Sequence, residues 1–377
     1  MRIALACAFV VAAAWPVVAQ EKGHPKVDQN KVDAAIDKGA KYLLEELKKG
    51  LADVKHPHGG DIPTDEIVFY TLIHSGVDPN DASFQKLLDK LLTKDLQKTY
   101  AVSLLAMSLE SYDRKKYQYR IAQCAQFLVD NQCKNGQWDY GEAVPLEKKE
   151  PPKKDVASGG GKVDGASGKT GKTESLPVIP VKRRQKARDS GDNSNAQYAA
   201  LGLRACLQAS VNIPQETLTD AVKWWEGNQA GDGGWGYGYM GSQDPSGYGS
   251  MTAGAVGALI IFRHFLKLDY KKDPKIAKGL QWLGNNFTEK ENPKYQQPSM
   301  WHLYWLYAVE RVGILLGTEF LGRHEWYPEG AKFLLESQGA DGSWKGQSIG
   351  GAVADTCFAI LFLRRATKPL PKVATGK

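Results

Sequence analysis

No stretch of the 377-residue chain is apolar for the roughly 20 residues that a membrane-spanning helix needs. The apolar run near the N-terminus, Ile3 to Ala14, is too short to cross a bilayer. Arg2 precedes it and the small residues Val17, Val18 and Ala19 follow, an order typical of a cleaved signal peptide over residues 1–19. We therefore expect an exported protein, periplasmic or secreted, whose mature chain begins near Gln20.

Cysteine is also scarce, with five in the chain and Cys7 inside the predicted signal peptide. Cys124 and Cys133 lie nine residues apart on one expected helix. That spacing exceeds the Cα separation of roughly 4.4–6.8 Å that a disulfide requires. Cys206 and Cys357 fall in apolar segments, where a thiol behaves as a small hydrophobic group. We predict four free, buried thiols in the mature protein.

The chain is not short of material for a core, because 42% of its residues are apolar and 10% aromatic. Its net charge of +7 arises entirely between residues 145 and 188, where twelve Lys or Arg accompany five Asp or Glu. This stretch is rich in Pro, Gly, Ser and Lys, so we predict that residues 142–190 form a flexible basic insertion in a single domain over 31–365. Its basic end, Lys182 to Arg188, is either a solvated loop or a contact for an anionic membrane surface. Nucleic acid is not expected as a partner of an exported protein.

The strongest pattern is a repeat in which Gln is followed six residues later by Trp. An aromatic residue precedes each Gln by five positions, and a Gly precedes each Trp by two. The three copies are Gln132 to Trp138, Gln229 to Trp235, and Gln338 to Trp344. We interpret the repeat as an amphipathic helix that ends at Gln, a Gly-containing turn, and a Trp that folds back over the turn. The role of these residues is therefore structural and not catalytic.

Amphipathic helices alternate along the chain with more uniformly apolar ones. The amphipathic helices are expected to start near Val32, Ala82, Ile121, Thr217, Pro274 and Glu325. The apolar segments follow at 67–73, 100–107, 197–203, 252–261, 300–316 and 356–363. A helix that is apolar on nearly all sides is buried on nearly all sides. The pattern predicts an all-α fold, an (α/α)6 toroid of six outer–inner helical hairpins around a central cavity.

The Gln-to-Trp repeat resembles the "QW" repeat of squalene cyclases and other terpenoid cyclases, and the related repeat of protein prenyltransferase β subunits. The resemblance covers roughly residues 31–365 apart from the basic insertion. It implies the toroid, and it makes an isoprenoid or other lipid the expected small ligand, with a protein partner as the alternative. It does not by itself imply a reaction, because one fold serves many chemistries.

Parallel inner helices would bring their N-termini together at one mouth of the ring, where polar residues then gather. Class II terpene cyclases carry an Asp-x-Asp-Asp-Thr-Ala motif there, whose middle Asp acts as the acid. In this chain Asp189 and Asp192 are three residues apart and Asn193 follows, so the motif is incomplete. The candidate acids are Asp192 and Asp355. The residues expected to line the cavity and bind a ligand are Asn193, Asn195, Gln197, Trp301, His302, Tyr304 and Trp305.

Single residues also bear on two other chemistries that toroid proteins carry out. Protein prenyltransferases bind zinc through Asp-x-Cys and a later His. Here Asp355 and Cys357 have that spacing, but the nearest inner-helix His is the earlier His302. We predict no metal and no cofactor, and zinc is not expected. Toroid glycosidases need two carboxylates across a cleft, for which Asp65 and Asp192 are the candidates.

Two functions of different class follow from these patterns. The first is a binding scaffold that holds an isoprenoid-like apolar ligand or a partner peptide in the toroid. The second is an enzyme of the terpenoid-cyclase type that acts on an isoprenoid by acid catalysis. An open, aromatic-lined cavity with Asp192 inside it would indicate an enzyme or lipid carrier, whereas an axis filled by side chains would indicate a scaffold.

Overall fold

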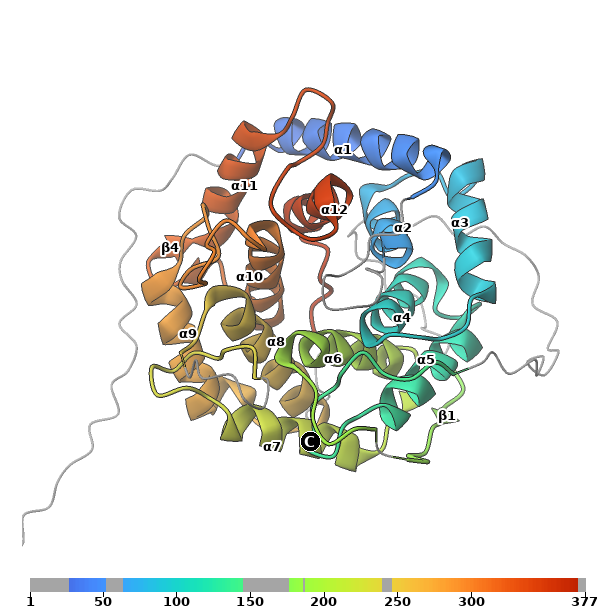
Figure 1. Cartoon of the computed structure of the whole chain (residues 1–377), viewed down its shortest axis with the longest axis vertical. Coiled ribbons are helices and arrows are strands. Elements are labelled where there is room, and N and C mark those ends of the chain that lie inside the picture. The colour runs from blue at the N-terminus through green and yellow to red at the C-terminus, as the bar shows by residue number, and fades with distance from the viewer. Residues whose placement is uncertain (1–26, 52–63, 145–175, 186, 239–245, 372–377) are drawn as a thin grey trace, which may run out of the picture.

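The computed structural model describes residues 27–51, 64–144, 176–185, 187–238 and 246–371. Twelve α-helices in this part of the chain form two concentric rings (Figure 1). The predicted signal peptide and residues 145–175 of the predicted insertion lie outside the described residues. None of the described helices is long and apolar enough to cross a membrane.

The outer ring consists of the amphipathic helices, and each starts within a few residues of its predicted position. They are α1 (Gln29–Lys49), α3 (Ala82–Thr93), α5 (Gln118–Asp130), α7 (Gln215–Gly227), α9 (Pro274–Asn286) and α11 (Trp326–Ser337). Asp81 and Asp273 begin two of them as N-caps, since each carboxylate accepts hydrogen bonds from two free backbone N–H groups of the first turn.

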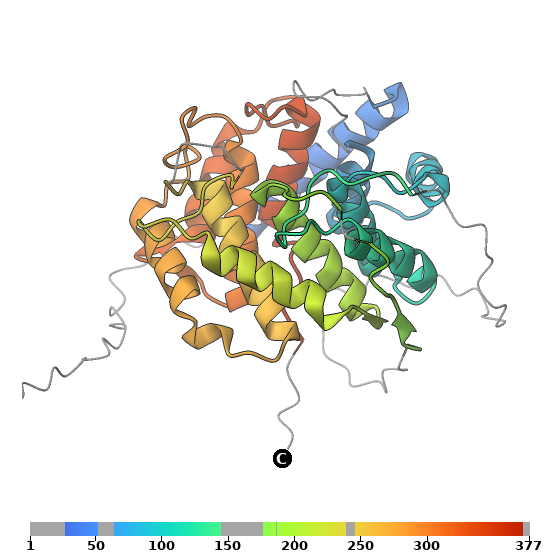
Figure 2. The same ribbon diagram turned by 60° about the horizontal axis from the view of Figure 1, so that its bottom comes forward.

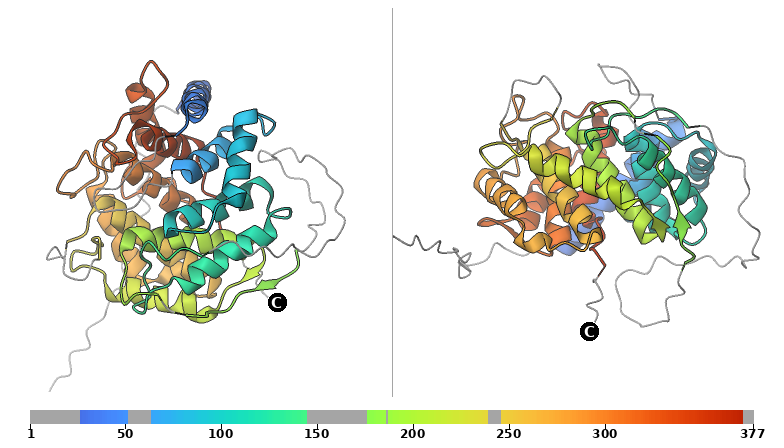
Figure 3. Two further views of the ribbon diagram at one scale, coloured as in Figure 1. Left: turned by 45° about the vertical axis from the view of Figure 1, so that its right-hand side comes forward. Right: turned by 90° about the horizontal axis from the view of Figure 1, so that it is seen from below.

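The inner ring consists of the apolar helices, each following its outer partner along the chain. They are α2 (Thr64–Ser75), α4 (Thr99–Asp113), α6 (Asn193–Gln208), α8 (Gly249–Phe265), α10 (His302–Leu316) and α12 (Gly351–Arg364). Every inner helix packs against the inner helices before and after it, and α12 closes the ring against α2. The predicted (α/α)6 toroid is therefore confirmed, and Figures 2 and 3 show the two layers from other sides.

The three Gln-to-Trp repeats form the same structure, which we call a clasp. In the second clasp, the side-chain amide of Gln229 donates to the carbonyl oxygens of Gly233 (2.8 Å) and Lys275 (2.9 Å), so it joins its own turn to the next outer helix. The indole N–H of Trp235 donates to the carbonyl of Trp225 at 2.8 Å, and its ring is fully buried. The corresponding bonds of the other two clasps link Gln132 to Thr217, Trp138 to Leu128, Gln338 to Ala35, and Trp344 to Leu334.

Each clasp turn depends on glycine. Gly136, Gly233 and Gly342 have φ angles of +95°, +92° and +86°, which side-chain-bearing residues resist. A Cβ on Gly342 would also lie 2.6 Å from the carbonyl oxygen of Lys38 on the neighbouring outer helix. The clasps therefore fix the turns against the outer ring, as the repeat predicts.

The end of the predicted basic insertion is not a flexible loop. Ile179–Pro180 forms β1, which pairs in parallel with β2 (Val211–Asn212) outside the ring. Arg183 donates to Asp220 at 3.2 Å and also bonds the amide oxygen of Gln132. Arg184 pairs with Asp130 at 2.6 Å. These two arginines therefore bind the protein's own carboxylates, which compete with any membrane surface for them.

The four cysteines of the described chain are all free and buried, as predicted. The remaining sheet is a short hairpin of β3 (Phe320–Leu321) and β4 (His324–Glu325) between α10 and α11. The hydrophobic core runs continuously between the two rings and inward to the axis of the inner ring.

Candidate functional site

The N-termini of the inner helices meet at one end of the ring, which we call the mouth. Their first turns carry a chain of hydroxyl groups, because Tyr100 of α4 donates to Ser194 of α6, and Ser194 lies 3.1 Å from the hydroxyl of Tyr304 of α10. The rings of Tyr140 and Tyr237 remain 37% and 39% exposed. The mouth is therefore a partly exposed surface that is rich in tyrosine.

Asp192 lies beside this hydroxyl chain as the N-cap of α6. Its two carboxylate oxygens accept from the backbone N–H of Asn195 at 2.7 Å and from the side-chain amide of Asn195 at 2.8 Å. Burial raises its pKa to about 6, and the nearby carboxylate of Asp139 adds to the rise. The negative charge of Asp192 in turn contributes to raised pKa values for Tyr100 and Tyr237, although burial is the larger cause for both. Asp192 is thus both a structural cap and a carboxyl group that can carry a proton near neutral pH.

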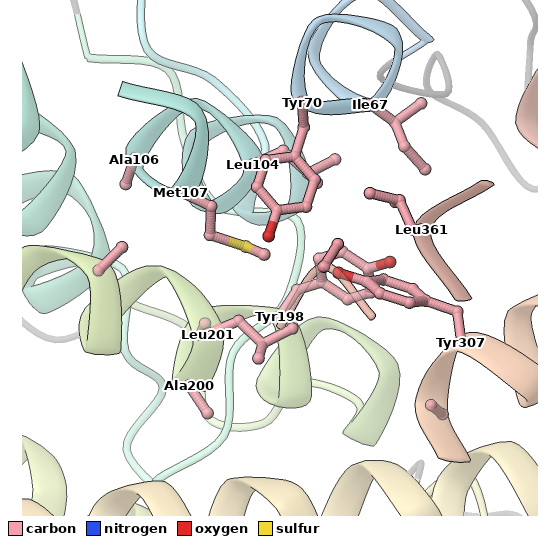
Figure 4. Close-up of a cluster of buried hydrophobic side chains, with 14 of the residues drawn as sticks. Ile67, Tyr70, Leu104, Ala106, Met107, Tyr198, Ala200, Leu201, Tyr307 and Leu361 are labelled. Carbon is pink, nitrogen blue, oxygen red and sulfur yellow. The ribbon is translucent and has the colours of Figure 1, made fainter. Parts of the chain in front are cut away.

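The axis of the ring below the mouth is filled by side chains. Arg311 is buried there, with its guanidinium 4.6, 5.5 and 5.9 Å from the ring centres of Tyr307, Tyr198 and Tyr304. Its Nη2 donates to the side-chain amide oxygen of Gln197 at 2.7 Å. Figure 4 shows Tyr70, Tyr198 and Tyr307 converging on one point with Leu104, Met107 and Leu361. The predicted central cavity is therefore occupied by the protein's own cation within an aromatic cage.

The opposite end of the ring is covered by the chain that follows α12, which crosses the ring in Figure 1. The backbone N–H and the hydroxyl of Thr367 donate to the buried carboxylate of Glu310 at 2.9 and 2.7 Å. Lys368 pairs with Glu110 at 3.0 Å, and its carbonyl oxygen accepts from Arg204 at 2.6 Å. Burial raises the pKa of Glu310 to about 7. These charged groups replace the apolar wall that an isoprenoid tunnel would need.

Asp355 is not part of the mouth's hydroxyl chain. It lies on the second turn of α12 and is 1% exposed. The loop that carries Gly346 and Ser348 covers its carboxyl group. Burial raises its pKa to about 6. Asp192 and Asp355 therefore resemble each other in acidity, but only Asp192 borders the tyrosines.

The aromatic residues predicted to line the cavity divide between two faces of α10. Tyr304, with Tyr307 and Arg311, faces the axis, since these residues recur at helical spacing. His302 faces outward, where its Nε2 lies 2.7 Å from the carbonyl of Glu289. Trp305 also faces outward and donates to the carbonyl of Thr288 at 3.0 Å. The prediction was wrong for His302 and Trp305, because residues one and two positions from Tyr304 turn away from the axis.

Trp301 and the three polar residues of α6 also take different positions. Trp301 is half-buried at the mouth, with its ring 6.0 Å from that of Tyr304. Asn193 faces outward, because its amide oxygen accepts from the indole of Trp224 at 2.8 Å. Asn195 is fully buried and leaves its Oδ1 without a hydrogen-bond partner among the described residues. Gln197 faces the axis as the partner of Arg311.

The residues considered for a metal site are not brought together. His302 faces the outer ring, whereas Cys357 interacts with Thr71 of α2. Across the described segments, no group of three or more His, Cys, Asp or Glu side chains could hold a metal ion. The glycosidase pair is not supported either, because Asp65 forms ion pairs with Lys90 (2.7 Å) and Lys94 (3.9 Å) at the outer ring.

Several residues of the interior were missed by the sequence analysis. Arg311 and Glu310 lie in a segment that was interpreted as a uniformly apolar inner helix. Arg204 lies near the C-terminal end of another inner helix, α6, and all three side chains are at most 3% exposed. A charged residue within an otherwise apolar helix is a signal that could have identified them, because buried charges need partners.

Neither a model of a protein family nor a curated protein sequence matches this chain. Solved structures do match in fold. A type II terpene cyclase, MstE from Scytonema, solved as a variant with geranylgeranyl dihydroxybenzoate, is 12% identical, with a TM-score of 0.52 over 89% of this chain and 97% of that one. A possible member of the GH105 family from Salmonella enterica serovar Paratyphi A is 11% identical, with a TM-score of 0.55 over 93% of this chain and 98% of that one. At these identities the likeness concerns the fold alone, which is the α/α toroid.

Proposed function

We propose that this protein is an exported, non-catalytic binding scaffold that recognises a partner peptide or protein segment at the tyrosine-rich mouth of the toroid. The observation that carries the proposal is the filled axis. Arg311 and its tyrosine cage occupy the space in which a toroid would hold an apolar ligand. With the other end covered by Thr367 and Lys368, the mouth is the end that remains for recognition.

The chemistry of the mouth suits a peptide. Partly exposed tyrosines provide rigid apolar area together with a hydroxyl group for hydrogen bonding, and they lose little side-chain entropy on binding. Tyr100, Tyr140 and Tyr237 provide these groups, and Trp301 adds a half-buried indole. The carboxyl group of Asp192 adds negative charge beneath them once it is ionised.

Site-specific photo-crosslinking in the native cell envelope tests this proposal. A photoreactive phenylalanine analogue at position 237 or 140 is expected to capture a partner protein, because both side chains border the mouth. The matched control is position 320, since Phe320 is 43% exposed but lies in the β3 hairpin. With the purified partner, Tyr237→Ala should weaken binding about tenfold or more, or about 1.4 kcal/mol. Equal capture at all three positions would contradict the proposal, as would a polyprenyl lipid bound one to one in the native protein.

A second candidate function rests on Asp192, whose buried carboxyl borders a chain of three hydroxyl groups. If the protein is a terpenoid-cyclase-type enzyme, Asp192 is the acid and must be protonated to act. Turnover of squalene or geranylgeranyl diphosphate, followed by mass spectrometry of the products, should then fall as the pH rises through about 6.

Substitution separates the two functions. Asp192→Asn keeps the helix cap, because Asn caps as well as Asp, but it removes the acidic proton. An enzyme should lose at least about 100-fold in turnover in this variant. Asp355→Asn is the matched control, since Asp355 is equally buried but lies apart from the hydroxyl chain. The enzyme hypothesis fails if wild type and both variants give the same products at the same rate, or none.

A further inference from the structure

A groove lies outside the mouth, between the turn of the second clasp and the exposed face of the outer helix α9. Its volume is about 670 Å³, which is within the range of sites that bind small molecules and peptide side chains. One wall is the backbone of Gly231 and Asp232, and the other carries Gln281 and Asn285 one turn apart on α9. Trp282 closes the floor, since only 5% of its surface is exposed. We call this feature the clasp groove.

The free charges of the clasp groove are positive. Lys278 on α9 and Lys294 in the following loop both line it, and among the described residues neither forms an ion pair with a carboxylate. Asp232 does not neutralise them by direct pairing, because its carboxylate accepts from the N–H of Gly234 (2.9 Å), the indole of Trp282 (2.9 Å) and the N–H of Gly247 (3.3 Å). The groove is therefore suited to a ligand that carries negative charge.

The first clasp shows what such a turn can bind. There the backbone N–H groups of Lys134 and Asn135 donate to the carbonyl oxygens of Arg188 (3.0 Å) and Asp189 (3.2 Å), which belong to an extended segment of the same chain. The carboxylate of Asp189 also pairs with the ammonium of Lys134 at 2.7 Å. A clasp turn can thus hold an extended peptide by its backbone and an acidic side chain by a lysine.

The second clasp has the same backbone groups available. Gly231 and Asp232 occupy the positions of Lys134 and Asn135, because in both clasps these residues come two and three positions after the Gln of the repeat. Their backbone N–H groups form no hydrogen bond with any other described residue. The amides of Gln281 and Asn285 face the same groove and offer both donors and acceptors, which match the peptide groups of an extended chain.

We infer that the clasp groove is a binding site for an extended, acidic peptide segment of a partner protein. The backbone of Gly231 and Asp232 would bind the peptide main chain, as the first clasp binds residues 188 and 189. Lys278 and Lys294 would bind its carboxylates. This site is separate from the tyrosine mouth, so either site can fail its test without affecting the other.

Fluorescence anisotropy with two labelled hexapeptides, one of six Glu and one of six Gln, tests the inference in the full-length mature protein. The Glu peptide should bind at least tenfold more tightly than the Gln peptide in low salt. The double variant Lys278→Gln, Lys294→Gln should lose at least tenfold in affinity for the Glu peptide. The matched double variant Lys271→Gln, Lys290→Gln has the same net charge, alters two exposed lysines that do not line the groove, and should bind as wild type does.

A third variant separates a specific site from general charge attraction. Gln281 is exposed on α9, so Gln281→Trp should fold normally and fill the groove with its larger ring while leaving the charge unchanged. This variant should bind the Glu peptide with an affinity at least tenfold lower than that of wild type. Equal affinity for both peptides, equal losses in the two lysine variants, or full binding by Gln281→Trp would each overturn the inference.

Discussion

Trp235→Ala is expected to lower the free energy of unfolding by about 3–5 kcal/mol, the usual cost of truncating a fully buried Trp. The ring of Trp235 packs between α8 and α9, where a Cβ on Gly279 would lie 2.8 Å from it and 2.6 Å from Val256. Alanine would leave a cavity there. It would also leave the carbonyl of Trp225 without the indole N–H that now donates to it at 2.8 Å.

Urea denaturation followed by circular dichroism measures this loss. The matched control is Tyr237→Ala, two residues along the same loop, whose side chain is 39% exposed and whose replacement should cost about 1 kcal/mol or less. The clasp would be unimportant for stability if the two variants unfolded at the same urea concentration.

The second large effect concerns pH, because Glu310 is buried and its pKa is raised to about 7 from an unfolded value of 4.5. The folded protein then holds a proton that the unfolded chain has already released, so stability is highest below the unfolded pKa and falls as the pH rises through the folded one. The loss from this group is about 3 kcal/mol between pH 4 and pH 8, of which about 1.4 kcal/mol falls between pH 6 and pH 8.

The free energy of unfolding at pH 6 and at pH 8 tests the role of Glu310. Asp192 and Asp355, with pKa values of about 6, are half ionised at pH 6, so they also lower the stability across this window. His74 acts in the opposite direction, because burial lowers its pKa to about 3 and its unfolded form loses a proton there. Relative to wild type, Glu310→Gln should therefore make the change in stability from pH 6 to pH 8 more favourable by about 1.4 kcal/mol. Glu319→Gln replaces an exposed carboxylate just after the end of α10 and should leave the difference unchanged. If both variants keep the wild-type difference, Glu310 does not titrate as its burial implies.

The stability measurements on Glu310 bear on function, because Glu310 belongs to the group of side chains that fills the axis of the ring. Arg311, Glu310 and the segment around Thr367 form one charged interior that replaces a ligand cavity. A protein that carried an apolar molecule in the ring would have to displace these charged side chains when the molecule bound. A scaffold that binds its partner outside the axis would leave them in place. The recognition surfaces that we propose are the tyrosine mouth and the clasp groove.

The repeat pattern alone determined the architecture of this protein. Gln at a fixed distance from Gly and Trp defines three clasps, and the alternation of amphipathic with apolar helices defines the two rings. These are local rules, because helical periodicity and turn geometry depend on residues within a few positions of one another. The six hairpins could therefore be predicted before any contact between them was known.

Only the tertiary structure decided what the ring encloses and which polar residues act together. The sequence places Arg311 and Tyr198 far apart, and nothing local indicates that the guanidinium enters the aromatic cage. Nothing local indicates either that the hydroxyl of Thr367 donates to the carboxylate of Glu310, or that the side chain of Trp305 faces away from the axis. Burial of a charge depends on every helix that surrounds it, so its partners come from closure of the ring and cannot be read from spacing along one helix.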